Sequence, residues 1–125
     1  MNAHYERLVS ARDAEALALV VGNNTHEMDA ADALADVVME ARLVPDHELP
    51  ENRVAMNSRV TYREDGGAKR TVRLVHPREA DPSTLRISVL SPVGRALLGR
   101  KRGSTIVASL PGGRSSRLHI LDVER

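Results

Sequence analysis

The chain of 125 residues contains no cysteine, no phenylalanine and no tryptophan, and it has only two tyrosines. Without cysteine it has no disulfide framework, no thiolate metal site and no cysteine nucleophile. Tyr5 and Tyr62 are too few for the row of stacking side chains that single-strand and RNA-recognition surfaces need. The core must therefore be built from Leu, Val, Ile, Ala and Met.

Long hydrophobic runs are also missing. Residues 1–16 carry charges throughout and show no apolar stretch of a signal peptide. No segment approaches the length of about 20 apolar residues that a membrane-spanning helix needs. We therefore expect a cytoplasmic protein without membrane contact, built as one small domain with an appendage.

Charge is divided unevenly along the chain, although the formal net charge is only +1. Residues 1–52 carry three basic and eleven acidic side chains, a net charge of −8. Residues 53–125 carry fifteen basic and six acidic side chains, a net charge of +9. Such polarity is typical of two parts with different partners, or of parts that attract each other. A weak nucleic-acid contact through the basic half, for example at residues 100–102, is one partner that it suggests.

The first half is predicted to be an antiparallel helical hairpin. Asn2 is placed to cap a helix that runs to about Val21 with apolar residues near a 3.6 period. Residues 22–27, GNNTHE, then form a turn in which Gly22 is the helix C-cap. A second helix follows to about Leu43, with one apolar and one acidic stripe.

The second half changes to a period of two and to β-rich composition. The turn signals DGG at 65–67 and PGG at 111–113 each lie between two such runs and predict two hairpins. The predicted strands are 53–64, 68–77, 85–91, 104–110 and 116–124, and one short helix runs from Pro92 to Leu98.

The expected fold class is therefore α+β. We expect a short coiled-coil arm over residues 1–44, a linker over 45–52 that contains two prolines, and an antiparallel β domain over 53–125 with one short helix.

The sequence contains no recognisable catalytic or cofactor motif. The five histidines show no metal-ligand spacing, and no G-x-S-x-G elbow is present. Gly94 and Gly99 have the spacing of a phosphate-binding loop, but Arg100 and Lys101 replace its Lys and Ser/Thr. We predict no catalytic residue, no metal and no cofactor.

Two motifs resemble a known family. Residues 87–124 contain I-S-x-x-S-P, then A-L-L-G, then P-G-G and a closing strand, and are similar to the C-terminal domain of the GreA/GreB transcript-cleavage factors. Residues 54–64, VAMNSRVTYRE, resemble a related family, the regulators of nucleoside diphosphate kinase. The resemblance implies an FKBP-like β domain that carries a short coiled coil. It also implies binding to RNA polymerase at its secondary channel, in competition with the cleavage factors.

The resemblance places a polymerase-binding surface at Leu90, Ser91, Pro92 and Arg95. Ser91 and Pro92 match the Ser-Pro corner of the cleavage factors, whereas Leu90 replaces the polar residue usual there. Proline at the first helical position presents Ser91 at a rigid corner. A purely structural role of Ser91 as a helix cap is the alternative.

The acidic residues Glu27, Asp29 and Asp32 are expected at the tip of the hairpin. Asp29 and Asp32 have the D-x-x-[E/D] spacing with which cleavage factors steady a catalytic Mg²⁺, but the surrounding family sequence is missing. The arm is also shorter than that of a cleavage factor. The alternative is that these carboxylates only complement a helix dipole.

We therefore expect a non-enzymatic regulator that binds RNA polymerase and does not stimulate transcript cleavage. A direct protein–protein regulator of nucleoside diphosphate kinase is the alternative. The name of the related family fits an indirect effect on the level of that kinase as well. Prolyl isomerase activity, suggested by the FKBP-like fold alone, is not expected, because its pocket is normally lined by aromatics and the β domain has only Tyr62.

Overall fold

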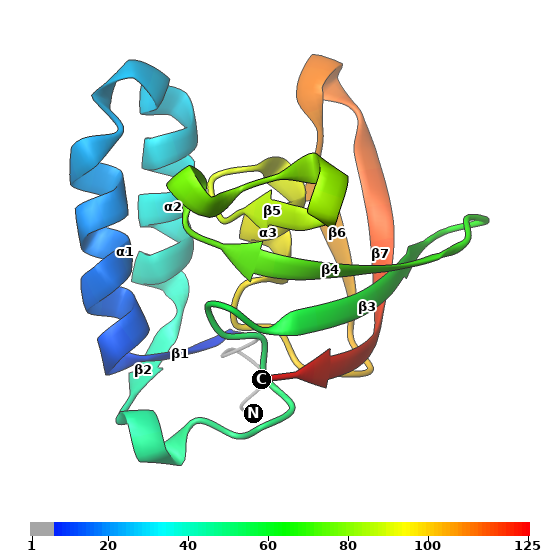
Figure 1. The fold of residues 1–125 in the computed structure, drawn as a ribbon, viewed down its shortest axis with the longest axis horizontal. Helices are drawn as coiled ribbons and strands as arrows, with labels where there is room; N and C mark the ends of the chain where they lie inside the picture. The colour runs from blue at the N-terminus through cyan, green and yellow to red at the C-terminus, as the bar shows by residue number, and fades with distance from the viewer. Residues whose placement is uncertain (1–6) are drawn as a thin grey trace.

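The computed structural model describes residues 7–125 and places a helical hairpin alongside a twisted sheet (Figure 1). The hairpin consists of α1 and α2, and its two ends are joined by a small parallel sheet, β1 with β2. The second sheet has five strands in the order β5-β4-β3-β7-β6, with the short helix α3 packed against β6. No described helix is both long and apolar enough to cross a membrane. The bounds are β1 Leu8–Ser10, α1 Ala11–Asn23, α2 Met28–Glu40, β2 Arg42–Val44, β3 Arg59–Glu64, β4 Lys69–Val75, β5 Arg86–Ser88, α3 Pro92–Leu97, β6 Thr105–Ser109 and β7 Ser115–Glu124.

Helix α1 begins nine residues later than the cap predicted at Asn2. Ser10 is the N-cap, and its Oγ accepts a hydrogen bond from the Asp13 N–H at 3.1 Å. The chain before it is extended, because Leu8–Ser10 pair with Arg42–Val44 in β1 and β2. Asn2 and Tyr5 lie outside the described residues. A capping serine followed by an acidic residue three positions later was the signal for the true helix start.

The turn of the hairpin also differs in detail from the prediction. Gly22 lies inside α1, and Asn24 is the C-cap, with its Nδ2 donating to the Val20 carbonyl at 2.7 Å. A 3₁₀ turn over Thr25–Glu27 then leads into α2. Helix α2 ends at Glu40, three residues before the predicted end at Leu43, because the chain becomes extended to form β2.

The five-stranded sheet contains both predicted hairpins, β3 with β4 and β6 with β7, and these pairs are antiparallel. The prediction of an antiparallel third strand over 85–91 was wrong in direction, because β5 runs parallel to β4. Two 3₁₀ turns, Pro77–Glu79 and Pro82–Thr84, carry the chain back before β5 begins. Leu85 completes this return in the left-handed region, at φ +58°. The sheet is therefore mostly antiparallel.

The arm and the β domain share one hydrophobic core. From the arm, Leu17 and Leu34 are fully buried, and they belong to the same cluster as Leu74, Leu97 and Leu118 of the β domain. The arm therefore lies along the β domain instead of projecting from it (Figure 1). The division into folding units at 1–44, 45–52 and 53–125 stays a prediction.

The end of α3 is held by side chains from distant parts of the chain. Nη1 of Arg7 donates to the carbonyl oxygens of Arg95 and Leu98, at 2.8 and 2.7 Å. Nη1 of Arg53 donates to the Gly99 carbonyl at 3.1 Å. Burial, followed by the charge of nearby Arg100, lowers the pKa of Arg53. Cations at a helix C-terminus satisfy its unpaired carbonyls and complement its dipole.

The start of α3 lies so close to β5 that only glycine fits at one position. A Cβ built on Gly94 would lie 2.1 Å from the carbonyl oxygen of Ser88. Gly22 offers a matched contrast, because a Cβ there meets nothing within 4 Å and the residue lies in a helix.

We predict that Gly94→Ala lowers the free energy of unfolding by about 2 kcal/mol, because α3 must move away from Ser88. Gly22→Ala should instead raise it by about 0.5 to 1 kcal/mol, since alanine is the better helix former. Urea denaturation of both variants measures the difference. Equal stabilities would contradict the close packing of α3 on β5.

We also predict that Arg7→Met, which keeps a long apolar stem, lowers the free energy of unfolding by about 2 kcal/mol through the lost caps of α3. Arg12→Met, at an exposed position on α1, is the control and should change it by less than about 0.5 kcal/mol. Thermal denaturation at equal pH and salt tests the pair. If both variants melt alike, Arg7 does not fasten the arm to the β domain.

Candidate functional site

A groove on one side of the molecule brings together most of the residues predicted to be functional. One wall is the corner between β5 and α3, and the facing wall is the start of α2. The turn after β6 and the 3₁₀ turn after β4 close it. Its lining residues are Glu27, Asp29, Ala30, Pro77, Ser88, Leu90, Ser91, Pro92, Arg95, Ser109, Leu110 and Pro111, and we call it the corner groove.

Ser91 is the rigid point of this groove. Its Oγ accepts a hydrogen bond from the Gly94 N–H at 3.0 Å and donates to the Ser88 carbonyl at 2.7 Å. Its own N–H bonds to the same carbonyl at 3.0 Å. Ser91 is therefore the N-cap of α3, and Pro92 occupies the first helical position. The hydroxyl is engaged inside the protein, so the capping role considered from the sequence is present in the structure.

Leu90 and Arg95 contribute to the groove in different ways. The Leu90 side chain is only 5% exposed and belongs to the core. Its carbonyl accepts a hydrogen bond from Nη1 of Arg95, which is half-buried. Burial lowers the pKa of Arg95 from its usual value. Arg95 therefore places a positive charge in the wall of the groove, held by the Leu90 carbonyl, whereas the Leu90 side chain itself is almost completely buried.

The acidic residues of the tip fall into two groups. Glu27 and Asp29 line the corner groove, across from the wall that carries Arg95. Asp32 lies farther along α2, is exposed and is not among the lining residues. Asp29 is in the first turn of α2, where a carboxylate complements the helix dipole. Among residues 7–125, no group of three or more His, Asp or Glu side chains is arranged to hold a metal ion.

A second, more apolar groove lies on the other side of the Ser-Pro corner. Its lining includes Tyr62, Arg86 and Val93, and it shares with the corner groove Ser88, Ser91, Pro92, Leu110 and Pro111. Burial is the main cause that raises the pKa of Tyr62. Ser91 and Pro92 therefore form a ridge between two hollows, a shape suited to contact with another surface.

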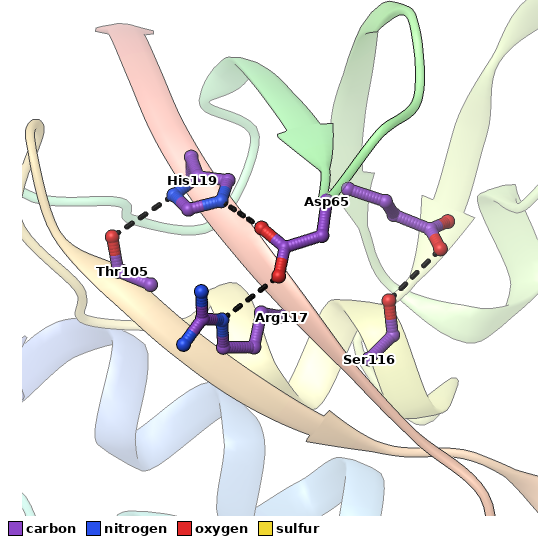
Figure 2. Close-up of polar contacts among 6 residues, drawn as sticks. Asp65, Thr105, Ser116, Arg117 and His119 are labelled. Atoms are coloured by element: carbon purple, nitrogen blue, oxygen red, sulfur yellow. Dashed lines mark hydrogen bonds and ion pairs between the residues drawn. The ribbon is translucent and has the colours of Figure 1, made fainter.

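One polar network was missed by sequence reasoning, which treated each histidine as an isolated strand or surface residue. Figure 2 shows His119 of β7 between Thr105 of β6 and Asp65 of the β3–β4 turn. Its Nδ1 lies 3.0 Å from the Thr105 hydroxyl, and its Nε2 contacts the Asp65 carboxylate. Nε of Arg117 donates to the other carboxylate oxygen at 2.9 Å. The hydrogen bonds from His119 and then Arg117 lower the pKa of Asp65.

The order hydroxyl, imidazole, carboxylate resembles that of a nucleophilic triad. However, the carboxylate is half exposed, and none of these residues lines either groove at the corner. The network instead binds the β3–β4 turn to β6 and β7. The cross-strand register of Thr105 with His119 was the signal that could have revealed it.

Comparison with known proteins agrees with this architecture. The family model described as "Transcription elongation factor, GreA/GreB, C-term" matches residues 49–125. The regulator of nucleoside diphosphate kinase of Escherichia coli (strain K12) is 34% identical over 119 residues, which cover 94% of this chain and 88% of that protein. The transcription elongation factor GreA of Christiangramia forsetii is 37% identical over 81 residues, 64% of this chain and 51% of that protein.

A solved structure agrees as well. The prokaryotic transcription elongation factor GreA/GreB from Nitrosomonas europaea superposes with a TM-score of 0.76 at 33% identity, covering 96% of this chain and 98% of that one. These relatives are named as a regulator or as transcription factors, not as enzymes. Because the family model covers well over half of the chain and the regulator aligns along nearly all of it, the chain belongs to the GreA/GreB C-terminal family of transcription elongation factors.

Proposed function

We propose that this protein is a regulator that binds RNA polymerase through the Ser91–Pro92 ridge near the secondary channel. There it competes with transcript-cleavage factors and does not stimulate cleavage itself. The observation that carries the proposal is that the acidic tip and the Ser-Pro corner line one groove.

The rigidity of the ridge supports a role in binding. Three hydrogen bonds hold Ser91 against Ser88 and Gly94, and Pro92 restricts the backbone at the start of α3. A surface that is already ordered loses little conformational entropy when it binds a partner. Hydrogen bonding inside the protein and recognition of a partner are therefore compatible roles of Ser91.

The position of the tip supports binding without cleavage. Each helix of the hairpin has 13 residues and is about 20 Å long at 1.5 Å per residue. Because the hairpin lies along the β domain, Glu27 and Asp29 would meet the same surface as Ser91 and Pro92. They would not extend far ahead of it into a channel. Catalysis requires reacting groups to be placed to within about 1 Å, so carboxylates held at the docking surface cannot assist a distant metal.

The chain spans about half of the GreA protein of Christiangramia forsetii but 88% of the Escherichia coli regulator of nucleoside diphosphate kinase.

The first test of the proposal is a binding measurement with core RNA polymerase. We predict that Ser91→Asp with Pro92→Ala weakens binding at least tenfold, about 1.4 kcal/mol. Aspartate still accepts the N-cap hydrogen bond from the Gly94 N–H but cannot donate to the Ser88 carbonyl, so the fold of the variant is checked first by circular dichroism. The substitution adds a negative charge to the ridge. Ser104→Asp with Pro50→Ala is the control, with the same change of charge and the same loss of one proline at residues that do not line the groove. Equal binding of both variants would remove the ridge from the proposal.

The second test is transcript cleavage in a backtracked polymerase complex. We predict that the wild-type protein gives no stimulation alone and reduces the stimulation by an added cleavage factor. Asp29→Ala with Asp32→Ala should keep the affinity for polymerase within a few fold, because exposed charge pairs contribute at most about 1 kcal/mol each. Strong stimulation that disappears in this double variant would show that the tip reaches the metal.

The name of the Escherichia coli relative raises direct binding to nucleoside diphosphate kinase as a second candidate. Calorimetric titration with the purified kinase separates direct contact from an indirect effect through transcription. We expect no heat of binding, because under the proposal above any effect on the kinase is indirect and passes through transcription. A stoichiometric complex would favour the second candidate.

A further inference from the structure

The solvent-facing side of β3, β4 and β5 carries basic residues that oppose one another in register. Val60 and Tyr62 of β3 and Val72 and Leu74 of β4 alternate with the outward positions and are buried, so these basic side chains lie on the opposite face of the sheet. The pairs are Arg59 with Arg73, Arg73 with Arg86, and Arg63 with Lys69, and we call these five residues the basic sheet face.

Like charges directly opposite each other destabilise a sheet, and here three such pairs occur on one face. Among the described residues, Arg63, Lys69 and Arg86 form no ion pair. The carboxylate of Asp81, which is bridged to Arg86 through the backbone, accepts hydrogen bonds from Ser83 at 3.1 and 2.7 Å. The repulsion is therefore only partly compensated, by Asp81 near Arg86 and by Glu124 beside Arg59.

The neighbouring half of the sheet is arranged differently. Arg117 of β7 forms an ion pair with Asp65 of the β3–β4 turn, which also contacts His119 of β7 (Figure 2). Asp122 of β7 lies 3.7 Å from Arg102. Glu124 of β7 partly compensates Arg59 at 3.5 Å. Within the sheet, the like-charge pairs thus lie on β3, β4 and β5, whereas Arg117 of β7 has an acidic partner.

The basic sheet face has two rows. Arg59, Arg73 and Arg86 form one row across the strands, and Arg63 with Lys69 forms the other. The rows are four residues apart along β3, about 13 Å at 3.3 Å per residue. This spacing matches the width of the B-DNA major groove, about 12 Å, which separates two phosphate backbones.

The residues between the rows indicate the kind of partner. Thr61 and Thr71 lie there with their hydroxyls 2.9 Å apart, and hydroxyls are frequent phosphate ligands. The solvent-exposed positions on this face of β3 and β4 carry no aromatic or aliphatic side chain, because Val75, which shares the face, is buried. Protein interfaces rely on such apolar anchors, and single-strand binding relies on aromatic stacking.

We propose that the basic sheet face binds the phosphate backbones of double-stranded DNA without sequence preference. The pairs of like charge are stabilised when phosphates take the place of the missing counterions. Binding releases condensed ions from the DNA and is therefore strongly dependent on salt. None of the five residues lines the corner groove, and Arg86 alone among them lines the second groove beside the ridge, so this proposal is tested separately from polymerase binding.

Fluorescence anisotropy with a short labelled DNA duplex between about 50 and 200 mM salt tests the proposal. The variant Arg63→Gln, Lys69→Gln, Arg86→Gln should lower the slope of log K against log salt by about 3 in magnitude. The control Arg70→Gln, Arg78→Gln, Arg114→Gln has the same net charge but alters basic residues outside the two rows, and it should keep the wild-type slope. Equal slopes for the two variants would mean attraction by net charge alone and would overturn the proposal.

Two competitors identify the partner. Polyglutamate should displace the duplex poorly, and an RNA duplex of equal length should bind more weakly, because the major groove of A-form helices is narrow. Displacement by polyglutamate at equal charge concentration would indicate an acidic protein partner and would contradict the proposal. Equal binding of RNA would contradict the match of the two rows to the B-DNA groove.

Thermal denaturation gives an independent reading. The triple variant of the basic sheet face should melt at a higher temperature than the wild type at low salt, because two of the three like-charge pairs, Arg63 with Lys69 and Arg73 with Arg86, lose their repulsion. The control triple variant should not. A lower melting temperature of the first variant would show that these side chains stabilise the fold and would overturn the proposal.

Discussion

The carbonyl groups at the end of α3 are capped by the Arg7 guanidinium from the opposite end of the chain, and the position of the arm depends on this contact. The N–H of Leu8 bonds to the Gly99 carbonyl at 3.0 Å, and the Arg7 carbonyl accepts from the Arg42 N–H at 3.1 Å. One extended segment therefore joins both ends of the helical hairpin to the β domain. The shared core and the corner groove follow from that attachment.

Much of the fold was predictable because local signals were strong. The glycine turns at 65–67 and 111–113 each lie between alternating apolar residues, and both hairpins were found. Ser91 and Pro92 predicted the start of α3 correctly. Two features depended on distant partners instead. Leu8–Ser10 has helical periodicity but becomes β1 because β2 offers it backbone hydrogen bonds, and β5 runs parallel to β4 because two 3₁₀ turns reverse the chain.

The candidate site was predictable in its residues but not in their arrangement. The sequence named Ser91 and Asp29 as parts of two separate surfaces, and only the packing of the arm on the β domain brings them into one groove. Similarly, a basic residue at every second position of a strand suggests an ordinary solvated face of the sheet. Their opposition as pairs of like charge depends on the register of β3 with β4 and β5, which no local pattern specifies.

The place of β7 in the sheet determines when this protein can become complete during its synthesis. Although β7 is the last strand of the chain, it lies between β3 and β6. Until it is available, β6 has no partner, and the sheet consists only of β5, β4 and β3. The pairing of β7 with β3 also closes a long loop, because the two strands are far apart in the sequence. Such non-local contacts raise the contact order and make the formation of this pair slow. A ribosome-bound chain thus exposes an unpaired strand edge until the ten residues of β7 have emerged.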